Sequence, residues 1–268
     1  MEHFTQVTPG ERVRLSEIDP GFRDGLKKRD EVVRERMAAA REEMSVMQER
    51  LYAEGKQSLL IVLQATDTGG KDGTIKHVMR GLNPVGVCVN SFKQPTPKEL
   101  AHDFLWRIHQ RAPERGQIGV FNRSHYEDVL VVRVRKLAPE SIWSQRYEHV
   151  NNFERLLAES GTRILKFFLY ISKDEQGERL QSRLDNPSKH WKFDPGDIED
   201  RKHWDQYIEA YEEVLSRCST DYAPWHVIPA NRKWYRNMIV AEIVAATLRE
   251  MDPQFPDAKF DPADISLD

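Results

Sequence analysis

Short apolar runs alternate with longer amphipathic stretches along this chain. Five runs are rich in apolar, β-branched or aromatic residues, and each predicts a β-strand, the first of them a buried one. They lie at 59–63, 85–92, 117–121, 163–171 and 225–229. Between them, apolar positions recur at helical spacing. The predicted helices lie at 26–54, from 71 onwards, and at 97–111, 139–160, 172–184, 204–217 and 231–251.

Strands that alternate with helices in this way predict an α/β fold. We expect a three-layer sandwich: a parallel sheet of about five strands with helices on both faces. The chain shows no internal repeat and no low-complexity linker, so we interpret residues 1–268 as a single domain.

Three stretches fit this alternation less simply. Residues 129–134 form a strand by propensity, but their position favours the start of a buried helix. Residues 185–202 contain Pro187, Pro195 and Gly196 among mixed charges, which is typical of a mobile lid. Residues 253–268 are acidic and rich in proline, so we expect a poorly ordered tail.

Composition narrows the classes of function. The chain has 268 residues, of which 39% are hydrophobic and 31% are charged. A net charge of −3 gives no overall attraction to nucleic acid or to a membrane surface. The two cysteines are too few for a disulfide framework, no apolar run is long enough to span a membrane, and the N-terminus lacks a signal pattern. We therefore predict a cytoplasmic protein without a nucleic-acid or membrane partner.

The stretch from residue 59 to 78 carries the clearest chemistry. An apolar strand leads into Gly69 and Gly70, and Lys71 then opens a helical pattern. Strand, glycine loop and helix in this order form a phosphate-binding loop, because backbone N–H groups and the helix N-terminus can approach an anion. The usual pattern G-x-x-x-x-G-K-[ST] is altered here, since Ala65 replaces the first glycine and Asp72 follows the lysine.

Asp67 lies in the middle of this loop and would repel a phosphate unless a metal ion lay between them. We interpret Asp67 as a group that binds the metal or orients the acceptor. The alternative is an ordinary strand-to-helix turn in which Lys71 is only solvated.

A second set of polar residues follows the third predicted strand, at 122–128. Because ligands bind at the carboxyl ends of parallel strands, we expect Arg123 to share a crevice with Asp67 and to grip phosphate oxygens. Asp128 is predicted to hold Mg²⁺ or to orient the acceptor, although it could be an ordinary solvated residue. We expect a structural role for His125, because an acceptor phosphate is already ionised and needs no general base. Two carboxylates, a lysine and an arginine around one crevice indicate phosphoryl transfer with Mg²⁺.

These motifs resemble those of the second polyphosphate kinase family. The resemblance extends over roughly residues 20–250. The matching stretches are 63–75 in the loop, 121–130 after the third strand, 183–187 and 191–193 in the lid, and 222–225. The resemblance implies a P-loop kinase fold with a helical lid that moves phosphate between inorganic polyphosphate and nucleotides with Mg²⁺, or with Mn²⁺ in its place. The segment 122–128, which begins with Asn122, resembles that of the subgroup called class III, which accepts AMP and ADP and forms ATP.

The resemblance also implies individual roles. Asp67 and Asp128 match two acids that hold the metal or the nucleotide, and Lys71 and Arg123 match a phosphate-binding pair; we expect these four residues to be catalytic. The residues that we expect to bind the phosphate chain or the nucleotide are Gly69, Gly70, Asp72, Gly73, Thr74, Lys76, Asn122, Arg183, Lys189 and Lys192. A homo-oligomer, dimer or tetramer, is also implied.

Two other functions remain open at this point. One is an ATP-dependent kinase of a nucleotide or small molecule on the same scaffold. The other is a polyanion-binding protein without catalysis, whose affinity would fall steeply with salt and ignore Mg²⁺.

Overall fold

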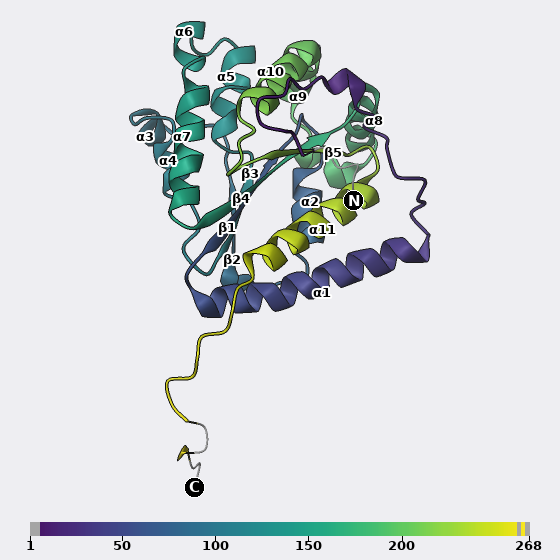
Figure 1. The fold of residues 1–268 in the computed structure, drawn as a ribbon. Helices are drawn as coiled ribbons and strands as arrows, with labels where there is room; N and C mark the ends of the chain where they lie inside the picture. The colour runs from purple at the N-terminus through teal and green to yellow at the C-terminus, as the bar shows by residue number, and fades with distance from the viewer. Residues whose placement is uncertain (1–5, 262–263, 266–268) are drawn as a thin grey trace.

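One five-stranded sheet forms the centre of the computed structural model, which describes residues 6–261 and 264–265. All of its neighbouring strands pair in parallel, in the order β2-β3-β1-β4-β5 (Figure 1). The strands are β1 Ser58–Gln64, β2 Val87–Ser91, β3 Ile118–Asn122, β4 Thr162–Tyr170 and β5 Trp225–Pro229. The predicted α/β fold with a parallel sheet is confirmed.

Alternate side chains of the strands point into two separate apolar layers. Ile61 and Leu63 of β1 pack toward helices α1, α2 and α11, and α1 and α11 lie side by side on that face (Figure 1). Leu60 and Val62 pack toward α4, α5, α7 and α10 on the other face. Every residue of β1 is buried, which explains why its sequence is a continuous apolar run instead of an alternating one.

The helices cover both faces and connect successive strands. The α-helices are α1 Glu31–Glu54, α2 Lys71–Val78, α3 Pro97–Leu100, α4 Trp106–His109, α5 Val131–Val134, α6 Glu140–Trp143, α7 Arg146–Glu159, α8 Lys173–Leu184, α9 Pro195–Lys202, α10 Trp204–Arg217 and α11 Lys233–Met251. The short 3-10 helices are η1 Leu15–Glu17, η2 Pro84–Gly86, η3 His125–Asp128 and η4 Pro187–Lys192. None of the helices in the described part of the chain is long and apolar enough to cross a membrane.

Two predicted helices are interrupted. The helix expected at 97–111 begins with a capping box formed by Thr96 and Glu99, but it divides into α3 and α4. Between them the Asp103 carboxylate accepts a hydrogen bond from the Leu105 N–H (2.9 Å), which stabilises a turn instead of a helix. The helix expected at 139–160 divides into α6 and α7. Residues 26–30, predicted as helix, form turns before α1 begins.

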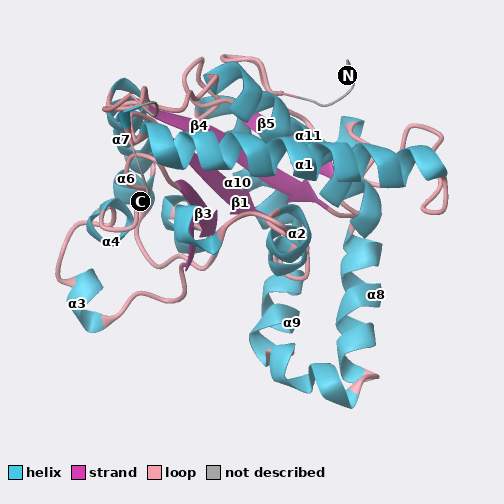
Figure 2. Cartoon of the chain, turned by 90° about the horizontal axis from the view of Figure 1, so that it is seen from below, coloured by secondary structure: helices cyan, strands magenta, loops and turns pink. Residues whose placement is uncertain are grey.

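The predicted lid segment is more regular than its sequence suggests. Residues 187–192 and 195–202 form η4 and α9, and the side chains of Asn186 and Asp194 accept hydrogen bonds at the start of each. Figure 2 shows α8 and α9 side by side, projecting from the body of the molecule. Arg183 of α8 forms an ion pair with Asp197 of α9 (2.9 Å), which joins the two arms. Residues 129–134 contain the short helix α5, as their position favoured.

The tail after α11 begins against the body. Pro253 is buried, and the Gln254 N–H donates to the Glu54 carboxylate (3.3 Å). Residues 262–263 and 266–268 lie outside the described residues, so the predicted disorder of the tail stays a prediction.

Candidate active site

The loop between β1 and α2 adopts the backbone conformation of a tight anion-binding turn. Thr68 and Gly70 both have positive φ, +62° and +101°, and the Gly69 N–H donates to the Thr66 carbonyl (3.0 Å). α2 then begins at Lys71, so the N-terminus of this helix opens directly onto the loop. The predicted order of strand, glycine loop and helix is confirmed.

Three side chains donate hydrogen bonds to backbone carbonyls of this loop. Arg179 donates to the carbonyls of Thr68 (3.0 Å) and Gly69 (3.2 Å), and Arg236 donates to Gly69 (3.0 Å). Gln176 donates to the Asp67 carbonyl (3.2 Å). Because these carbonyl oxygens are engaged by donors, they are restrained from turning toward a bound phosphate, which they would repel.

A cleft of about 610 Å³ opens at the carboxyl ends of β1, β2 and β3. Its walls are the loop 67–73, residues 91–94 after β2, Asn122 and Arg123 after β3, and the lid. Five cationic side chains line it: Lys71, Lys93, Arg123, Arg183 and Lys192. Four aspartates line it as well: Asp67, Asp72, Asp194 and Asp197. The cleft therefore offers a polyanion several cations, with carboxylates beside them, despite the net negative charge of the chain.

Arg123 lies between two carboxylates. Its guanidinium is 3.1 Å from Asp67 and 3.7 Å from Glu127, and the attraction of Glu127 and then of Asp67, against the cost of burial, raises the pKa of Arg123. Arg123 has a positive φ of +62°, a conformation that costs a non-glycine residue about 1–2 kcal/mol. Its backbone N–H donates to the Leu63 carbonyl (3.1 Å) at the end of β1, and this bond fixes the segment against the phosphate loop.

Lys71 is a partly desolvated cation. Its ammonium donates to the Ala65 carbonyl (3.1 Å), across the loop. Burial and then the charge of Arg123 lower the pKa of Lys71 to about 8, while Asp67 opposes the shift. A phosphate chain in the cleft would supply the negative charge that this site lacks.

Asp128 does not line this cleft. It accepts hydrogen bonds from Arg146 at its side chain (3.0 Å) and at its backbone carbonyl (3.1 Å). Burial raises the pKa of Asp128 to about 6, although Arg146 and Arg107 oppose the rise. Glu127, one residue earlier, is the carboxylate that the short helix η3 brings beside Arg123 and Asp67. The metal-binding role predicted for Asp128 stays a prediction, with Glu127 as a further candidate.

The other predicted residues differ in whether they line the cleft. Asp72 and Asn122 meet across the cleft, where the Asn122 amide donates to the Asp72 carboxylate (2.7 Å). Gly69, Gly70 and Gly73 line the cleft, whereas the Thr74 hydroxyl is turned into its own helix and donates to the Gly70 carbonyl (3.2 Å). Lys76 is exposed on α2 and lines none of the described hollows.

Arg183, Lys189 and Lys192 line a second hollow of about 400 Å³ on the lid side of the same loop. Three cations that the sequence analysis missed, Arg179, Lys233 and Arg236, lie there as well. Gly70 and Gly73 border both hollows, so a chain of phosphates could pass from one to the other along the loop.

Among the described residues, no group of three or more His, Cys, Asp or Glu side chains could hold a metal ion by itself. Mg²⁺ is commonly held by one or two carboxylates together with substrate phosphates and water. Asp67 lines the cleft, and Glu127 lines a smaller hollow together with Asp67 and Arg123. Both are oxygen donors of this kind, 18% and 17% exposed, and they therefore fit such an ion.

We expect Gly70→Ala to damage the loop severely. An added Cβ would lie 2.0 Å from Nη1 of Arg236, and the φ of +101° is itself unfavourable for alanine. Thermal unfolding should show a lower Tm and polyphosphate binding should be weakened. Gly81→Ala is a matched control, because its φ is +98° but its Cβ would meet nothing within 4 Å. Equal effects of the two substitutions would contradict the clash with Arg236.

Comparisons with known proteins agree with this geometry. The model of the family described as polyphosphate kinase 2 matches residues 27–256. The chain belongs to the polyphosphate kinase 2 family. The resemblance noted from the phosphate loop and the segment after β3 is thereby confirmed.

Curated relatives and a solved structure of this family are similar over nearly the whole chain. An AMP/ADP-polyphosphate phosphotransferase of Meiothermus ruber is 53% identical over 251 residues, with 94% of each chain covered. An ADP-polyphosphate phosphotransferase of Rhodopseudomonas palustris is 42% identical and covers 94% of this chain and 91% of its own. The crystal structure of a polyphosphate kinase 2 from Arthrobacter aurescens superposes with a TM-score of 0.91 at 43% identity, covering 96% of this chain and 92% of the other.

Proposed function

We propose that this member of the polyphosphate kinase 2 family transfers phosphoryl groups from inorganic polyphosphate to AMP and ADP, forming ADP and ATP, with Mg²⁺. The observation that carries the proposal is the cationic cleft, in which separate strand ends place Lys71, Arg123 and Asp67 around one opening. The names of the relatives from M. ruber and R. palustris support polyphosphate as the donor and AMP and ADP as acceptors.

The chemistry needs positioning more than covalent catalysis. An oxygen of the acceptor's terminal phosphate attacks the terminal phosphorus of polyphosphate. The bond from that phosphorus to the bridging oxygen breaks, and the shortened chain keeps the electron pair. The acceptor oxygen is already ionised, so no residue has to remove a proton. Lys71 and Arg123 hold the phosphate oxygens, and the loop 67–73 orients the donor chain.

Asp67, with Glu127 or Asp128, would hold the metal ion. Mg²⁺, or Mn²⁺ in its place, supplies charge neutralisation on the phosphate oxygens when it is bound. The lid of α8, η4 and α9 adds Arg183, Lys189 and Lys192 to the donor side, and its closure would exclude water from the reaction.

Formation of ATP from AMP and from ADP, with long-chain polyphosphate as the only donor, tests this proposal. We expect ATP from both acceptors and none after removal of divalent cations with EDTA. If ATP formed from ADP but not from AMP, phosphoryl transfer from polyphosphate to ADP would be supported and AMP would be excluded as an acceptor. Turnover with ATP as the donor and none with polyphosphate would favour an ATP-dependent kinase, and tight polyanion binding without turnover would favour a binding protein.

We also propose that the protein is a cytoplasmic homo-oligomer, a dimer or tetramer. The family resemblance supports the oligomer, and the use of nucleotides as substrates supports the compartment. Light scattering that shows a monomer at the concentration used in the activity assay would contradict the proposed homo-oligomer.

The pKa of Lys71 predicts a pH dependence. The protonated ammonium attracts phosphate, and its pKa is about 8 in the free enzyme. We therefore expect kcat/KM for polyphosphate to be highest below pH 8 and to fall as the pH rises through about 8. In Lys71→Arg, whose guanidinium keeps its charge, the fall near this pH should disappear even if the overall rate is lower. A wild-type profile that stays flat through pH 9 would exclude Lys71 as the titrating group.

A further inference from the structure

Arg183, a lid cation that lines both the cleft and the second hollow, already has an anionic partner within the lid. Its Nη1 donates to the Asp197 carboxylate and to the Lys192 carbonyl, each at 2.9 Å. Arg183 lies on α8 and Asp197 on α9, the two arms that project from the body in Figure 2. The two side chains are 23% and 14% exposed, so water screens their attraction less than that of a surface ion pair.

Asp197 faces the phosphate-binding residues across the cleft. It lines the same cleft as Asp67 and Arg123. Burial and then the charge of Asp67 raise the pKa of Asp197 to about 6, while Arg183 opposes the rise. The charge of Asp197 in turn contributes to the raised pKa of Arg123. Asp197 therefore presents a negative charge to the side of the cleft at which donor phosphate oxygens would bind.

A carboxylate and a phosphate group compete for the same guanidinium. Both accept charge-assisted hydrogen bonds from the planar N–H groups of arginine. A donor phosphate that binds Arg183 must first separate Arg183 from Asp197, so the loss of the old contact offsets the gain of the new one. Because both partners lie on the lid, they can separate without a change in the central sheet.

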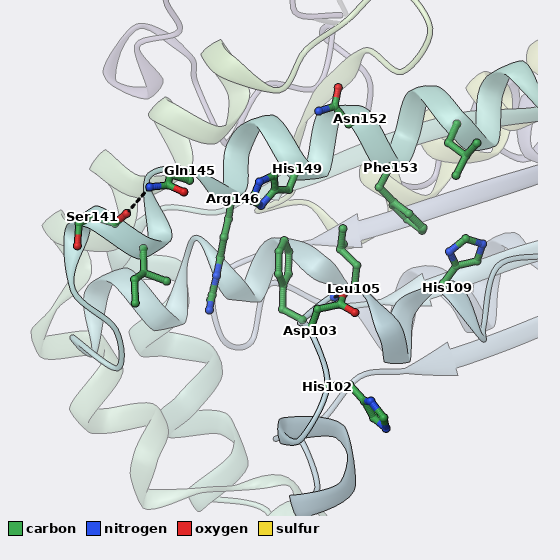
Figure 3. Close-up of a pocket in the computed structure, with 13 residues that line it drawn as sticks. His102, Asp103, Leu105, His109, Ser141, Gln145, Arg146, His149, Asn152 and Phe153 are labelled. Carbon is green, nitrogen blue, oxygen red and sulfur yellow. Dashed lines mark hydrogen bonds between the residues drawn. The ribbon is translucent and has the colours of Figure 1, made fainter.

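The large cavity outside the phosphate cleft does not offer the donor chain an alternative. This cavity, of about 790 Å³, lies between the segment 102–109 and helices α6 and α7 (Figure 3). Among the described residues that line it, Arg146 is the one lysine or arginine, and Arg146 already donates to Asp128 (3.0 Å). Donor affinity therefore depends on the cations of the cleft and the lid, and on whether Arg183 is available.

We propose that Asp197 is an internal competitor for Arg183 and sets the affinity of the enzyme for its phosphate donor. In the free enzyme the Asp197 carboxylate occupies the Arg183 guanidinium, and a polyphosphate chain displaces it on binding. The donor is then bound more weakly than the number of cations suggests, which favours release of the shortened chain after each transfer. This inference rests on the proposed function, because it concerns the donor of the same reaction.

Asp197→Asn tests the competition by a gain of affinity, which damage to the fold would not produce. The amide keeps the shape of the side chain and removes its charge. Isothermal titration calorimetry with polyphosphate of one defined chain length, in EDTA and without nucleotide, measures the Kd. We expect this Kd to fall by roughly tenfold, the weight of one hydrogen bond to a charged group.

Glu199→Gln is a matched control for the loss of charge. It removes one negative charge from the same helix, at a side chain that is 56% exposed and lines none of the described hollows. Because salt screens an exposed charge, its Kd should stay within about twofold of the wild-type value. A tenfold gain in both variants would overturn the inference, since the net charge of the lid would then be the cause.

Arg183→Gln and the double variant Arg183→Gln/Asp197→Asn complete a double-mutant cycle. If Asp197 occupies Arg183, the loss of Arg183 should weaken binding at least about fivefold more in the Asp197→Asn background than in the wild-type background. Equal losses in the two backgrounds would overturn the inference, because the two side chains would then act independently. Weaker binding by Asp197→Asn would also overturn it, and would assign the ion pair to holding the lid in its binding shape.

These binding measurements need no turnover, so the inference and the proposed function can fail separately. A wild-type enzyme that makes no ATP from ADP and polyphosphate, yet shows the coupling between Asp197 and Arg183, would overturn the proposed function and support Asp197 as a competitor for a bound polyanion. ATP formation without tighter binding in Asp197→Asn would support the proposed function and overturn the inference.

Discussion

Asp67→Asn is expected to lower the turnover of ADP with polyphosphate by roughly a hundredfold to a thousandfold, the range seen when one preorganised electrostatic contact is removed. The substitution keeps the shape of the side chain and removes its charge. The Asp67 carboxylate is 18% exposed and 3.1 Å from Arg123. Its loss removes the loop acid proposed to hold the metal and leaves Arg123 with Glu127 alone. The Tm should change little, because asparagine can still accept a hydrogen bond from Arg123.

Steady-state kinetics with ADP and polyphosphate, at several Mg²⁺ concentrations, measure this effect. Asp174→Asn is a matched control, since Asp174 is exposed in the first turn of α8 and lines none of the described hollows; its turnover should equal that of the wild type. Partial recovery of Asp67→Asn at high Mg²⁺ would support the metal-binding role. Retention of more than a tenth of wild-type turnover would remove Asp67 from the mechanism.

The phosphate loop could be predicted from the sequence because its signals are local. The apolar run 59–63, Gly69, Gly70 and Lys71 specify the strand, the turn and the helix start within about twenty residues. The fold class followed from the same kind of signal, since all five strands are short apolar runs that the structure confirms. The breaks at Asp103 and before α7 were missed, because a single polar residue in a helical pattern is compatible with both a helix and a turn.

The direction of a side chain in an irregular turn could not be predicted. Glu127 and Asp128 are adjacent, and the sequence analysis selected Asp128. The 3-10 geometry of η3 brings Glu127 to Arg123 and Asp128 to Arg146. Arg179 and Arg236 were missed for a different reason. They come from α8 and α11, more than a hundred residues from the loop carbonyls that they hold, and no pattern in the sequence links such distant positions.

The buried ion pair of Lys166 was also missed, although the sequence does indicate it. Lys166 interrupts the apolar run 163–171, which was predicted to be a strand, and a lysine that such a strand buries requires a buried acid as partner. The structure provides Glu154 of α7, and both side chains are 0% exposed. His125 belongs to the same cluster, with Nε2 3.1 Å from Glu154, which confirms the structural role expected for it.

Lys166→Met is expected to destabilise the fold by about 3–5 kcal/mol, the usual cost of leaving one member of a buried ion pair alone. The Lys166 ammonium donates to Glu154 (2.5 Å), to the Tyr126 hydroxyl (2.8 Å) and to the Cys218 carbonyl (2.5 Å). Although burial opposes it, the charge of Lys166 holds the pKa of Glu154 below its usual range, so the carboxylate stays ionised in the folded protein. Methionine has a similar volume but no charge and no donor. Urea unfolding, with its midpoint and slope, measures the loss.

The double variant Lys166→Met/Glu154→Leu separates two causes of that loss. Replacement of a whole buried ion pair by apolar residues is often close to neutral, so the double variant should be more stable than Lys166→Met alone. The recovery cannot be complete, because the Cys218 carbonyl and the Tyr126 hydroxyl still lack Lys166, and Tyr126 and His125 also lose Glu154. A double variant as unstable as the single one would place the cost in these polar groups and not in the unpaired carboxylate. The same two variants also show whether the cluster of Lys166, Glu154, Tyr126 and His125 positions Arg123, because His125 and Tyr126 follow Arg123 and Ser124 in the chain. If the cluster does position Arg123, a stable double variant should still have a raised KM for polyphosphate.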